Sequence, residues 1–217
     1  RLMPTSMTTV PFFTIDDLRR PDGAKWVCSP PVRTPADCER MWQGLAEGTI
    51  QVIGTDHCPF FFDGRRPDLY EGKEVCIPKK ELGAGDFTRI PNGLPGVGDR
   101  LPVLWTHGVG AGKLTPSQFV ALNCTNPAKI FGLYPRKGCL LPGADADIVI
   151  WDPAREITYG VAYSQQRTDY NLYEGWKLTG FPAQVFLRGR LIVDGAKWLG
   201  EAGSGQFLKR RPFAPVL

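Results

Sequence analysis

The stretch Val52-Ile-Gly-Thr-Asp-His-Cys-Pro-Phe60 places a carboxylate and an imidazole directly after a short apolar run. Residues 49–54 have the length and apolar character of a buried strand. Asp56 therefore follows the carboxyl end of that strand, which is where α/β barrels keep their active sites. The spacing alone leaves two interpretations open. Asp56 binds a metal ion, takes a proton from a metal-bound water or does both, or it only caps a helix or turn, as aspartate after a strand often does.

The residues before this stretch predict one βα unit and the strand that follows it. Residues 24–28 form an apolar run stopped by the Pro30-Pro31 pair, which predicts a buried strand and then a rigid loop. The Thr34-Pro35 pair predicts the start of a helix that ends at Gly48. Its apolar residues recur at helical spacing, and they are Cys38, Met41, Trp42 and Leu45. This order indicates a parallel sheet covered by helices.

The residues after this stretch change from loop to helix and then to sheet. Residues 60–98 are rich in glycine, proline and charge, which predicts a long functional loop. Helices are expected over residues 99–108, 115–123 and 126–132. Alternating apolar residues then predict strands over residues 147–152, 184–188 and 190–194, with a tight turn at Gly189. We place a domain boundary near residues 135–142, and we expect an extended tail over residues 200–217 that is available to a neighbouring subunit.

The composition is that of an ordinary globular protein. The 217 residues are 42% hydrophobic, and the net charge of +4 comes from 26 basic and 22 acidic residues spread along the chain. This pattern lacks the clustered basic face that nucleic-acid binding needs. The sequence shows no signal peptide and no apolar run long enough to span a membrane. The six cysteines never form a Cys-x-x-Cys pair, so we expect free thiols and a cytoplasmic protein.

Three further motifs carry little weight. Residues 108–113 resemble a phosphate-binding loop, but His107 and Leu114 stand where that motif needs glycine and a hydroxyl. Residues 93–98 are glycine-rich, yet they contain Pro95 and follow no clear strand, so they fit a substrate-facing loop better than a dinucleotide site. The three basic residues at 209–211 are typical of a solvated tail.

Several blocks along the chain resemble consecutive blocks of the dihydropyrimidinase and D-hydantoinase family of cyclic amidohydrolases. The resemblance covers nearly the whole chain in the right order, which makes it more specific than any single motif. The blocks are Cys28-Ser-Pro-Pro31, Gly54-Thr-Asp-His-Cys-Pro-Phe60, Ile90-Pro-Asn-Gly-Leu-Pro-Gly96, Pro142-Gly-Ala-Asp-Ala-Asp-Ile-Val-Ile150, Asp169-Tyr-Asn-Leu-Tyr-Glu-Gly175 and Gly203-Ser-Gly-Gln-Phe207. Dihydroorotases and allantoinases share the second and fourth blocks, but the last two favour the pyrimidine and hydantoin branch.

The resemblance implies an α/β fold. Residues 1–138 would be the last strands and helices of a (β/α)8 barrel, and residues 139–217 would be the C-terminal portion of a small β-sandwich with its extended tail. It also implies a site with two metal ions, usually zinc, bridged by hydroxide and a carboxylated lysine. The substrates would be cyclic ureides such as dihydropyrimidines and hydantoins, opened to N-carbamoyl amino acids. A homotetramer is implied as well.

The resemblance also assigns roles to three residues. Asp56 would be a metal ligand and the catalytic acid and base, while Ser29 and Asn92 would hold the cyclic imide, largely through backbone groups. The other metal ligands of the family lie upstream of the region that matches this chain. His57 is expected to hydrogen-bond near the site, and His107 is expected to be a packed or surface residue rather than a ligand. The chain begins at Arg1, so we expect it to be part of a longer protein, and these 217 residues alone to be inactive.

Two alternatives to the enzyme stay open at this point. The first is a non-catalytic scaffold or assembly protein of the same family, although Asp56 at the barrel mouth favours the enzyme. The second is an independent binding module, but part of a barrel leaves strand edges unpaired, so we expect these residues to aggregate on their own. About a dozen residues around 65–80 depart from the family pattern as an insertion, which weakens any inference about substrate side chains.

Overall fold

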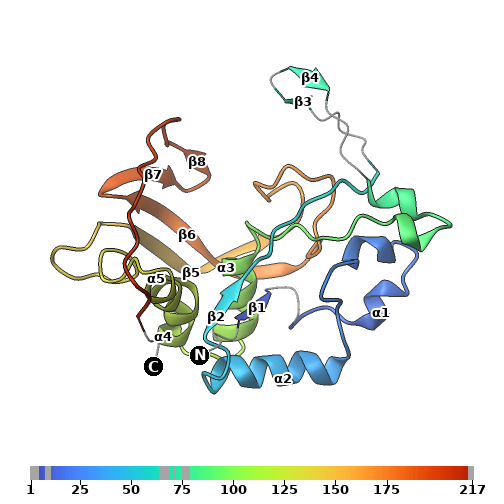
Figure 1. Ribbon diagram of the computed structural model, residues 1–217, viewed down its shortest axis with the longest axis horizontal. Helices are drawn as coiled ribbons and strands as arrows, with labels where there is room; N and C mark the ends of the chain where they lie inside the picture. The colour runs from blue at the N-terminus through green and yellow to red at the C-terminus, as the bar shows by residue number, and fades with distance from the viewer. Residues whose placement is uncertain (1–4, 8–10, 64–68, 71, 75–78, 215–217) are drawn as a thin grey trace.

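The computed structural model describes residues 5–7, 11–63, 69–70, 72–74 and 79–214, and it shows a mixed α/β chain (Figure 1). The α-helices are α1 (Ile15–Leu18), α2 (Pro35–Ala46), α3 (Arg100–Leu104), α4 (Pro116–Val120) and α5 (Asn126–Ile130). Short 3₁₀ turns are η1 (Gly23–Trp26), η2 (Lys80–Gly83) and η3 (Phe87–Arg89), and wider π-helical turns are η4 (Trp105–Val109) and η5 (Ala121–Thr125). The strands are β1 (Thr5–Met7), β2 (Val52–Gly54), β3 (Leu69–Tyr70), β4 (Lys73–Glu74), β5 (Ile148–Thr158), β6 (Lys177–Leu187), β7 (Arg190–Asp194) and β8 (Lys197–Trp198).

Strand β2 pairs in parallel, as the sequence predicts, but its partner is β1, a strand that the sequence does not predict. Thr5 lies opposite Val52 and Met7 opposite Gly54. The strand is shorter than the predicted residues 49–54, but Ile53 is buried as expected. The predicted helix before it is confirmed as α2. The Thr34 hydroxyl caps this helix by accepting a hydrogen bond from the backbone N–H of Asp37 at 3.4 Å. The helix ends just before Gly48, whose φ is +79°.

The strand predicted over residues 24–28 is wrong, because this segment begins as the 3₁₀ turn η1. Backbone hydrogen bonds from Lys25 to Asp22 and from Val27 to Ala24 close the turn. The Lys25 ammonium also donates to the Asp22 carboxylate at 3.0 Å. Burial was predicted correctly, since Trp26 and Cys28 lie in the core. Apolar character thus located a buried segment, but local hydrogen bonds decided its backbone conformation.

The expected second and third helices run together into one helical segment over residues 116–130. Thr115 caps it, and α4, η5 and α5 follow without an intervening loop. Pro127 has no N–H to donate to a carbonyl one turn earlier, and the wide turn η5 comes directly before it. Asn123 meanwhile donates its side-chain amide to the carbonyl of Phe119 at 2.8 Å. The proline therefore alters the helix locally rather than ending it.

Strands β5 to β8 form the antiparallel sheet expected near the end of the chain. Their spatial order follows the sequence order, and β5 and β6 extend further than the alternation predicts. Arg188 and Gly189 both have positive φ, +51° and +78°, which fits the tight two-residue turn predicted between β6 and β7. Helix α3 packs against β6, so the sheet lies directly against the helices of the earlier segment (Figure 1).

One large apolar cluster draws residues from both sides of the proposed domain boundary. Phe13, Trp26 and Val103 share it with Tyr173 and Phe181. A second cluster surrounds β2 and joins α2 to the helical segment 116–130. The division at residue 138 therefore stays a prediction, and the two segments share a core within the described residues.

The tail is extended as predicted, and it runs along its own chain. Arg211 donates its backbone N–H to the carbonyl of Gly132 at 2.9 Å, and Ala214 donates to that of Lys129 at 3.0 Å. The predicted free thiols are confirmed for Cys28, Cys58, Cys124 and Cys139, and Cys76 lies outside the described residues. None of the helices in the described part of the chain has the length and apolarity needed to cross a membrane.

Candidate active site at the carboxyl end of strand β2

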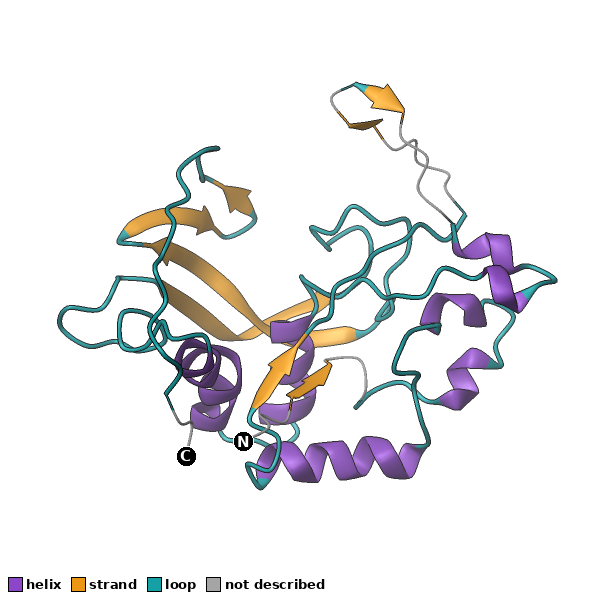
Figure 2. Cartoon of the chain, in the orientation of Figure 1, coloured by secondary structure: helices purple, strands orange, loops and turns teal. Residues whose placement is uncertain are grey.

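Asp56 lies where the sequence places it, just beyond the carboxyl end of β2, which ends at Gly54. The chain that follows this strand is mostly loop (Figure 2). Its φ is +47°, a left-handed conformation that residues other than glycine seldom adopt. The side chain is exposed. Within the described ranges, the carboxylate makes no hydrogen bond and no ion pair. Asp56 therefore does not cap a turn there, and its oxygens are available to a ligand.

His57 fastens the loop after β2 to the loop of residues 94–97. Its Nδ1 accepts from the backbone N–H groups of Gly96 at 3.0 Å and Val97 at 3.2 Å. Cys58 adds a backbone hydrogen bond to the carbonyl of Leu94 at 2.9 Å. Burial lowers the pKa of His57, so the neutral imidazole that accepts these bonds is favoured. The expected local hydrogen bonding of His57 is thus confirmed, and its Nδ1 is already occupied.

Ser29 and Asn92 come from segments 63 residues apart, and the fold brings them together. The Asn92 side-chain amide donates to the Ser29 hydroxyl at 2.5 Å, and Gly93 donates its backbone N–H to the carbonyl of Val27 at 3.2 Å. Both side chains are exposed. The two residues that the resemblance assigns to the substrate therefore form one surface on adjoining loops.

Two contacts connect this surface to the loop that carries Asp56. A methyl group at Gly93 would lie 2.8 Å from the Cys58 sulfur and 2.6 Å from the Cys58 carbonyl oxygen, so only glycine fits there. Burial raises the pKa of the Cys28 thiol, and the nearby negative charge of Asp56 raises it further. The loops around residues 27–30, 55–58 and 91–97 therefore lie side by side at one end of β2.

Lys80 is a residue of this region that the sequence did not reveal. Its side chain is completely buried, and its ammonium donates to the carbonyls of Val27 at 2.9 Å and Pro91 at 3.2 Å. Burial lowers the pKa of Lys80 to about 8. Lysine is almost never fully buried unless it has partners, and a lysine at the edge of a charged loop gives no sign of such a position.

Asp99 is a second buried charge that the sequence did not single out. Its Oδ1 accepts from the Tyr159 hydroxyl at 2.8 Å and from the side-chain amides of Gln166 at 2.7 Å and Asn171 at 3.1 Å. Burial raises the pKa of Asp99, although these three hydrogen bonds act in the opposite direction. The network connects the start of α3 to the long loop between β5 and β6.

His107 is a packed residue, as expected. Its ring lies edge-on to Trp176, with 5.1 Å between the ring centroids, and 5.6 Å from Phe12. Burial lowers its pKa. The donors for a metal ion are correspondingly few: within the described ranges, no three His, Cys, Asp or Glu side chains come together as a group that could hold one. The exposed carboxylate of Asp56 fits the role of one ligand, and the described residues do not supply the rest of a site.

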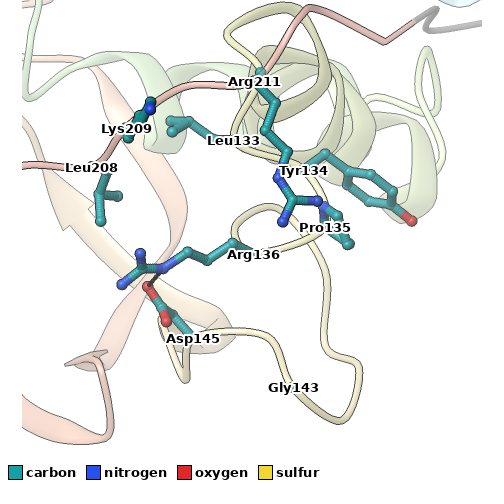
Figure 3. Close-up of a pocket in the computed structure, with 10 residues that line it drawn as sticks. Leu133, Tyr134, Pro135, Arg136, Gly143, Asp145, Leu208, Lys209 and Arg211 are labelled. Atoms are coloured by element: carbon teal, nitrogen blue, oxygen red, sulfur yellow. Dashed lines mark hydrogen bonds and ion pairs between the residues drawn. The ribbon is translucent and has the colours of Figure 1, made fainter.

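The hollow drawn in Figure 3 lies elsewhere. It has a volume of about 350 Å³ and lies between the loop after α5 and the tail. The Arg136 guanidinium points to the Asp145 carboxylate at 3.0 Å, and Arg211 extends along Tyr134. None of the predicted site residues lines this hollow, and its charged side chains are largely paired or open to solvent, so we do not assign it a ligand.

The comparisons with known proteins agree with this geometry. The model of the amidohydrolase family matches residues 27–192. A D-hydantoinase of Rhizobium radiobacter is 42% identical over 204 residues, which are 93% of this chain and 41% of the relative. A D-hydantoinase of Ralstonia pickettii is 40% identical over 215 residues, 98% of this chain and 44% of the relative. The crystal structure of a dihydropyrimidinase from Brevibacillus agri NCHU1002 has a TM-score of 0.87 and 38% identity, covering 97% of this chain and 43% of that one.

The chain thus spans less than half the length of the relatives it matches. The similarity confirms the predicted fold class, the C-terminal part of an α/β barrel followed by part of a small β-sandwich. It extends across the Asp56 loop and the loops that carry Ser29 and Asn92. Because the family model covers most of the chain, and the expected segments lie in the expected order, the chain belongs to the amidohydrolase family.

Proposed function

We propose that the whole protein containing this chain is a metal-dependent hydrolase that opens cyclic ureide rings, such as dihydropyrimidines and hydantoins, to N-carbamoyl amino acids. The names of the relatives, D-hydantoinase and dihydropyrimidinase, support this substrate class. The observation that carries the proposal is the position of Asp56. An exposed carboxylate with left-handed backbone lies at the carboxyl end of a parallel strand, beside the Ser29 and Asn92 surface.

Asp56 would have two roles in this reaction. The amidohydrolase family is in general metal-dependent, and we propose zinc, with two ions in the whole protein and Asp56 as the one ligand from this chain. The other ligands and a carboxylated lysine would come from outside it. When bound, the metal ions would activate water and polarise the ring carbonyl. Asp56 would take a proton from the attacking water and give it to the ring nitrogen as the carbon–nitrogen bond breaks.

Ser29 and Asn92 would hold the ring in place for that attack. Their side chains bind to each other, and among the described residues no backbone hydrogen bond occupies the N–H or carbonyl of either residue, so these groups could face a cyclic imide. An imide offers carbonyl acceptors and an N–H donor in one plane, which backbone N–H and carbonyl groups can match. This arrangement would hold the ring beside Asp56 in the bound substrate and in the transition state alike.

The same features weigh against a non-catalytic scaffold of this family. A scaffold has no need for a carboxylate held in a costly backbone conformation and left without a partner among the described residues. We propose a homotetramer in the cytoplasm as the working form of the enzyme.

The experiment uses the full-length protein and its Asp56→Asn variant, with Asp16→Asn as the matched control. Asp16 is exposed, and its ion partner among the described residues is Arg19, at 2.7 Å on the surface. We expect zinc in the wild type and hydrolysis of hydantoin and dihydrouracil, with Asp56→Asn reducing kcat by at least about 100-fold, since it removes both the proton carrier and a charged ligand. Zinc content and kcat of Asp16→Asn should match the wild type. Absence of both metal and turnover in the intact wild-type protein would favour the scaffold.

A further inference from the structure

Lys80 connects the two loops that carry the proposed substrate surface. Its ammonium donates to the carbonyl of Val27, two residues before Ser29, and to the carbonyl of Pro91, one residue before Asn92. The side chain is fully buried, so water cannot replace these bonds. A single side chain thus holds both loops from the buried side, while Ser29 and Asn92 are exposed to solvent.

The backbone of Lys80 is itself firmly placed. Its N–H donates to the carbonyl of Phe61 at 2.9 Å, and that of Glu81 donates to the carbonyl of Phe62 at 3.0 Å. The Asp169 carboxylate accepts hydrogen bonds from the backbone N–H groups of Phe62 at 2.7 Å and Asp63 at 3.0 Å. These bonds hold the segment to which the Lys80 backbone is hydrogen-bonded. The ammonium therefore projects from a segment that hydrogen bonds attach to the C-terminal part of the chain.

A buried ammonium is a costly way to join two loops if stability were its only purpose. Removing a charged group from water is unfavourable, and an apolar side chain of the same size would fill the space without that penalty. Hydrogen bonds from a charged donor are shorter and stronger than neutral ones, so they hold two carbonyls more closely than apolar packing can. The ammonium lies between the carbonyls of Val27 and Pro91. This placement therefore indicates that it sets the positions of the neighbouring residues Ser29 and Asn92.

We propose that Lys80 is a positioning residue of the substrate site, which sets the spacing between the Ser29 and Asn92 loops without touching the substrate. This inference rests on the proposed function for its substrate class, a cyclic imide or ureide. Because the backbone groups it positions would contact the ring before and during the reaction alike, its loss weakens binding in both states. Its effect belongs mainly to KM, and only secondarily to kcat.

The test compares Lys80→Met with Lys79→Met in the full-length, zinc-loaded protein. Methionine keeps the length and apolar stem of lysine but has no donor. Lys79 is the adjacent residue, and its ammonium makes no hydrogen bond with any residue that the structure describes. We expect Lys80→Met to raise KM for hydantoin at least about tenfold, with kcat within about threefold of the wild type and the zinc content unchanged. Lys79→Met should leave KM within about twofold of the wild type.

A purely structural role predicts a different pattern. A destabilised protein loses active molecules, so apparent kcat and melting temperature fall while KM stays constant, and that result would overturn the proposal. If Lys80→Met does not fold, Lys80→Leu takes its place, because leucine is also apolar and has no donor. An unchanged KM in that variant would equally overturn the proposal.

Hydrogen exchange gives a readout that needs no activity. The backbone N–H of Gly93 donates to the carbonyl of Val27, so it reports directly whether the two loops stay together. We expect peptides spanning residues 91–96 to exchange faster in Lys80→Met than in Lys79→Met. If the wild-type protein shows no turnover, the proposed function fails, and this measurement alone decides whether Lys80 joins the loops.

Discussion

At the scale of single residues, Asp56 places a carboxylate at a position where the backbone favours glycine. A left-handed conformation costs an ordinary residue about 1–2 kcal/mol, and only glycine adopts it freely. Aspartate tolerates it better than most residues, but glycine would be the most stable choice at a φ of +47°. The residue there is nevertheless an aspartate. Backbone strain of this kind is often found at functional sites, where the side chain is needed for the reaction.

Comparing Asp56→Gly with Asp56→Ala tests this interpretation. Both remove the carboxylate, so both should lose activity, but alanine still has a Cβ in the left-handed region. We expect Asp56→Gly to be more stable than Asp56→Ala by about 1 kcal/mol in urea unfolding of the metal-free protein. Equal stability of the two variants would show that the backbone relaxes out of the left-handed region and that Asp56 is not strained.

The residues found from the sequence and those missed differ in a physical way. Asp56, Ser29 and Asn92 lie in exposed loops within short distinctive motifs, and the structure brings Ser29 and Asn92 into contact. Lys80 and Asp99 are buried and hydrogen-bonded, and the segments that bury them lie far away in the sequence. A charged residue in a polar loop is expected to be solvated, so no local pattern distinguishes these two from their neighbours.

At the scale of elements, periodicity located the helices and strands, but tertiary contacts decided their form. The apolar residues 24–28 are buried as predicted, yet hydrogen bonds within residues 22–27 make them a 3₁₀ turn instead of a strand. Separate helices were expected over residues 115–123 and 126–132, and the fold joins them in one helical segment that includes Pro127. Short apolar runs report burial more reliably than they report backbone conformation. Part of the predicted insertion over residues 65–80 lies outside the described residues.

The Asp99 network is the main polar connection between α3 and the loop that joins β5 to β6. Asp99→Ala removes the acceptor of three buried donors, those of Tyr159, Gln166 and Asn171. We expect it to lower the free energy of unfolding by about 3 kcal/mol or more, since each buried donor left unpaired costs about 1–3 kcal/mol. Asp99→Asn keeps an oxygen acceptor and removes a charge that burial disfavours, so its cost should be about 1 kcal/mol.

Urea unfolding of the full-length protein measures both variants. Hydrogen exchange of residues 159–171 should increase in Asp99→Ala and stay close to the wild type in Asp99→Asn. If the two variants were equally destabilised, the charge of Asp99 would matter more than its acceptor oxygen, which contradicts the role assigned to the network.

At the scale of the whole molecule, the segments on both sides of residue 138 fold as one hydrophobic unit. Phe13 and Trp26 share a core with Tyr173 and Phe181, so a division into barrel and sandwich does not appear as separate cores in the described residues. The order of the blocks along the sequence could predict the family and the fold class. Single-sequence patterns could not predict how tightly the two segments pack, because that depends on side chains meeting across large sequence separations.

Burial of Lys80 also has a consequence for the stability of the whole molecule. Its pKa falls from an ordinary 10.5 to about 8 in the folded protein, so the folded state disfavours the ammonium. Below pH 8 both the folded and unfolded states are protonated and the penalty is fully present. Between pH 8 and 10.5 the unfolded state binds more protons, so the contribution of Lys80 to stability rises with pH, by up to about 3 kcal/mol.

Lys80→Met isolates this contribution from those of the other groups that titrate in the same range. The thiols of Cys28 and Cys58 face the ammonium, and burial raises the pKa of Cys28, so its ionisation lowers stability as pH rises. Both proteins contain these thiols, and their effect largely cancels in the difference. We expect the stability of the wild type relative to Lys80→Met, measured by urea unfolding of the full-length proteins, to increase by about 3 kcal/mol from pH 7.5 to 10.5. A difference independent of pH would mean that the ammonium is solvated in the folded protein, and that it does not hold the two loops together.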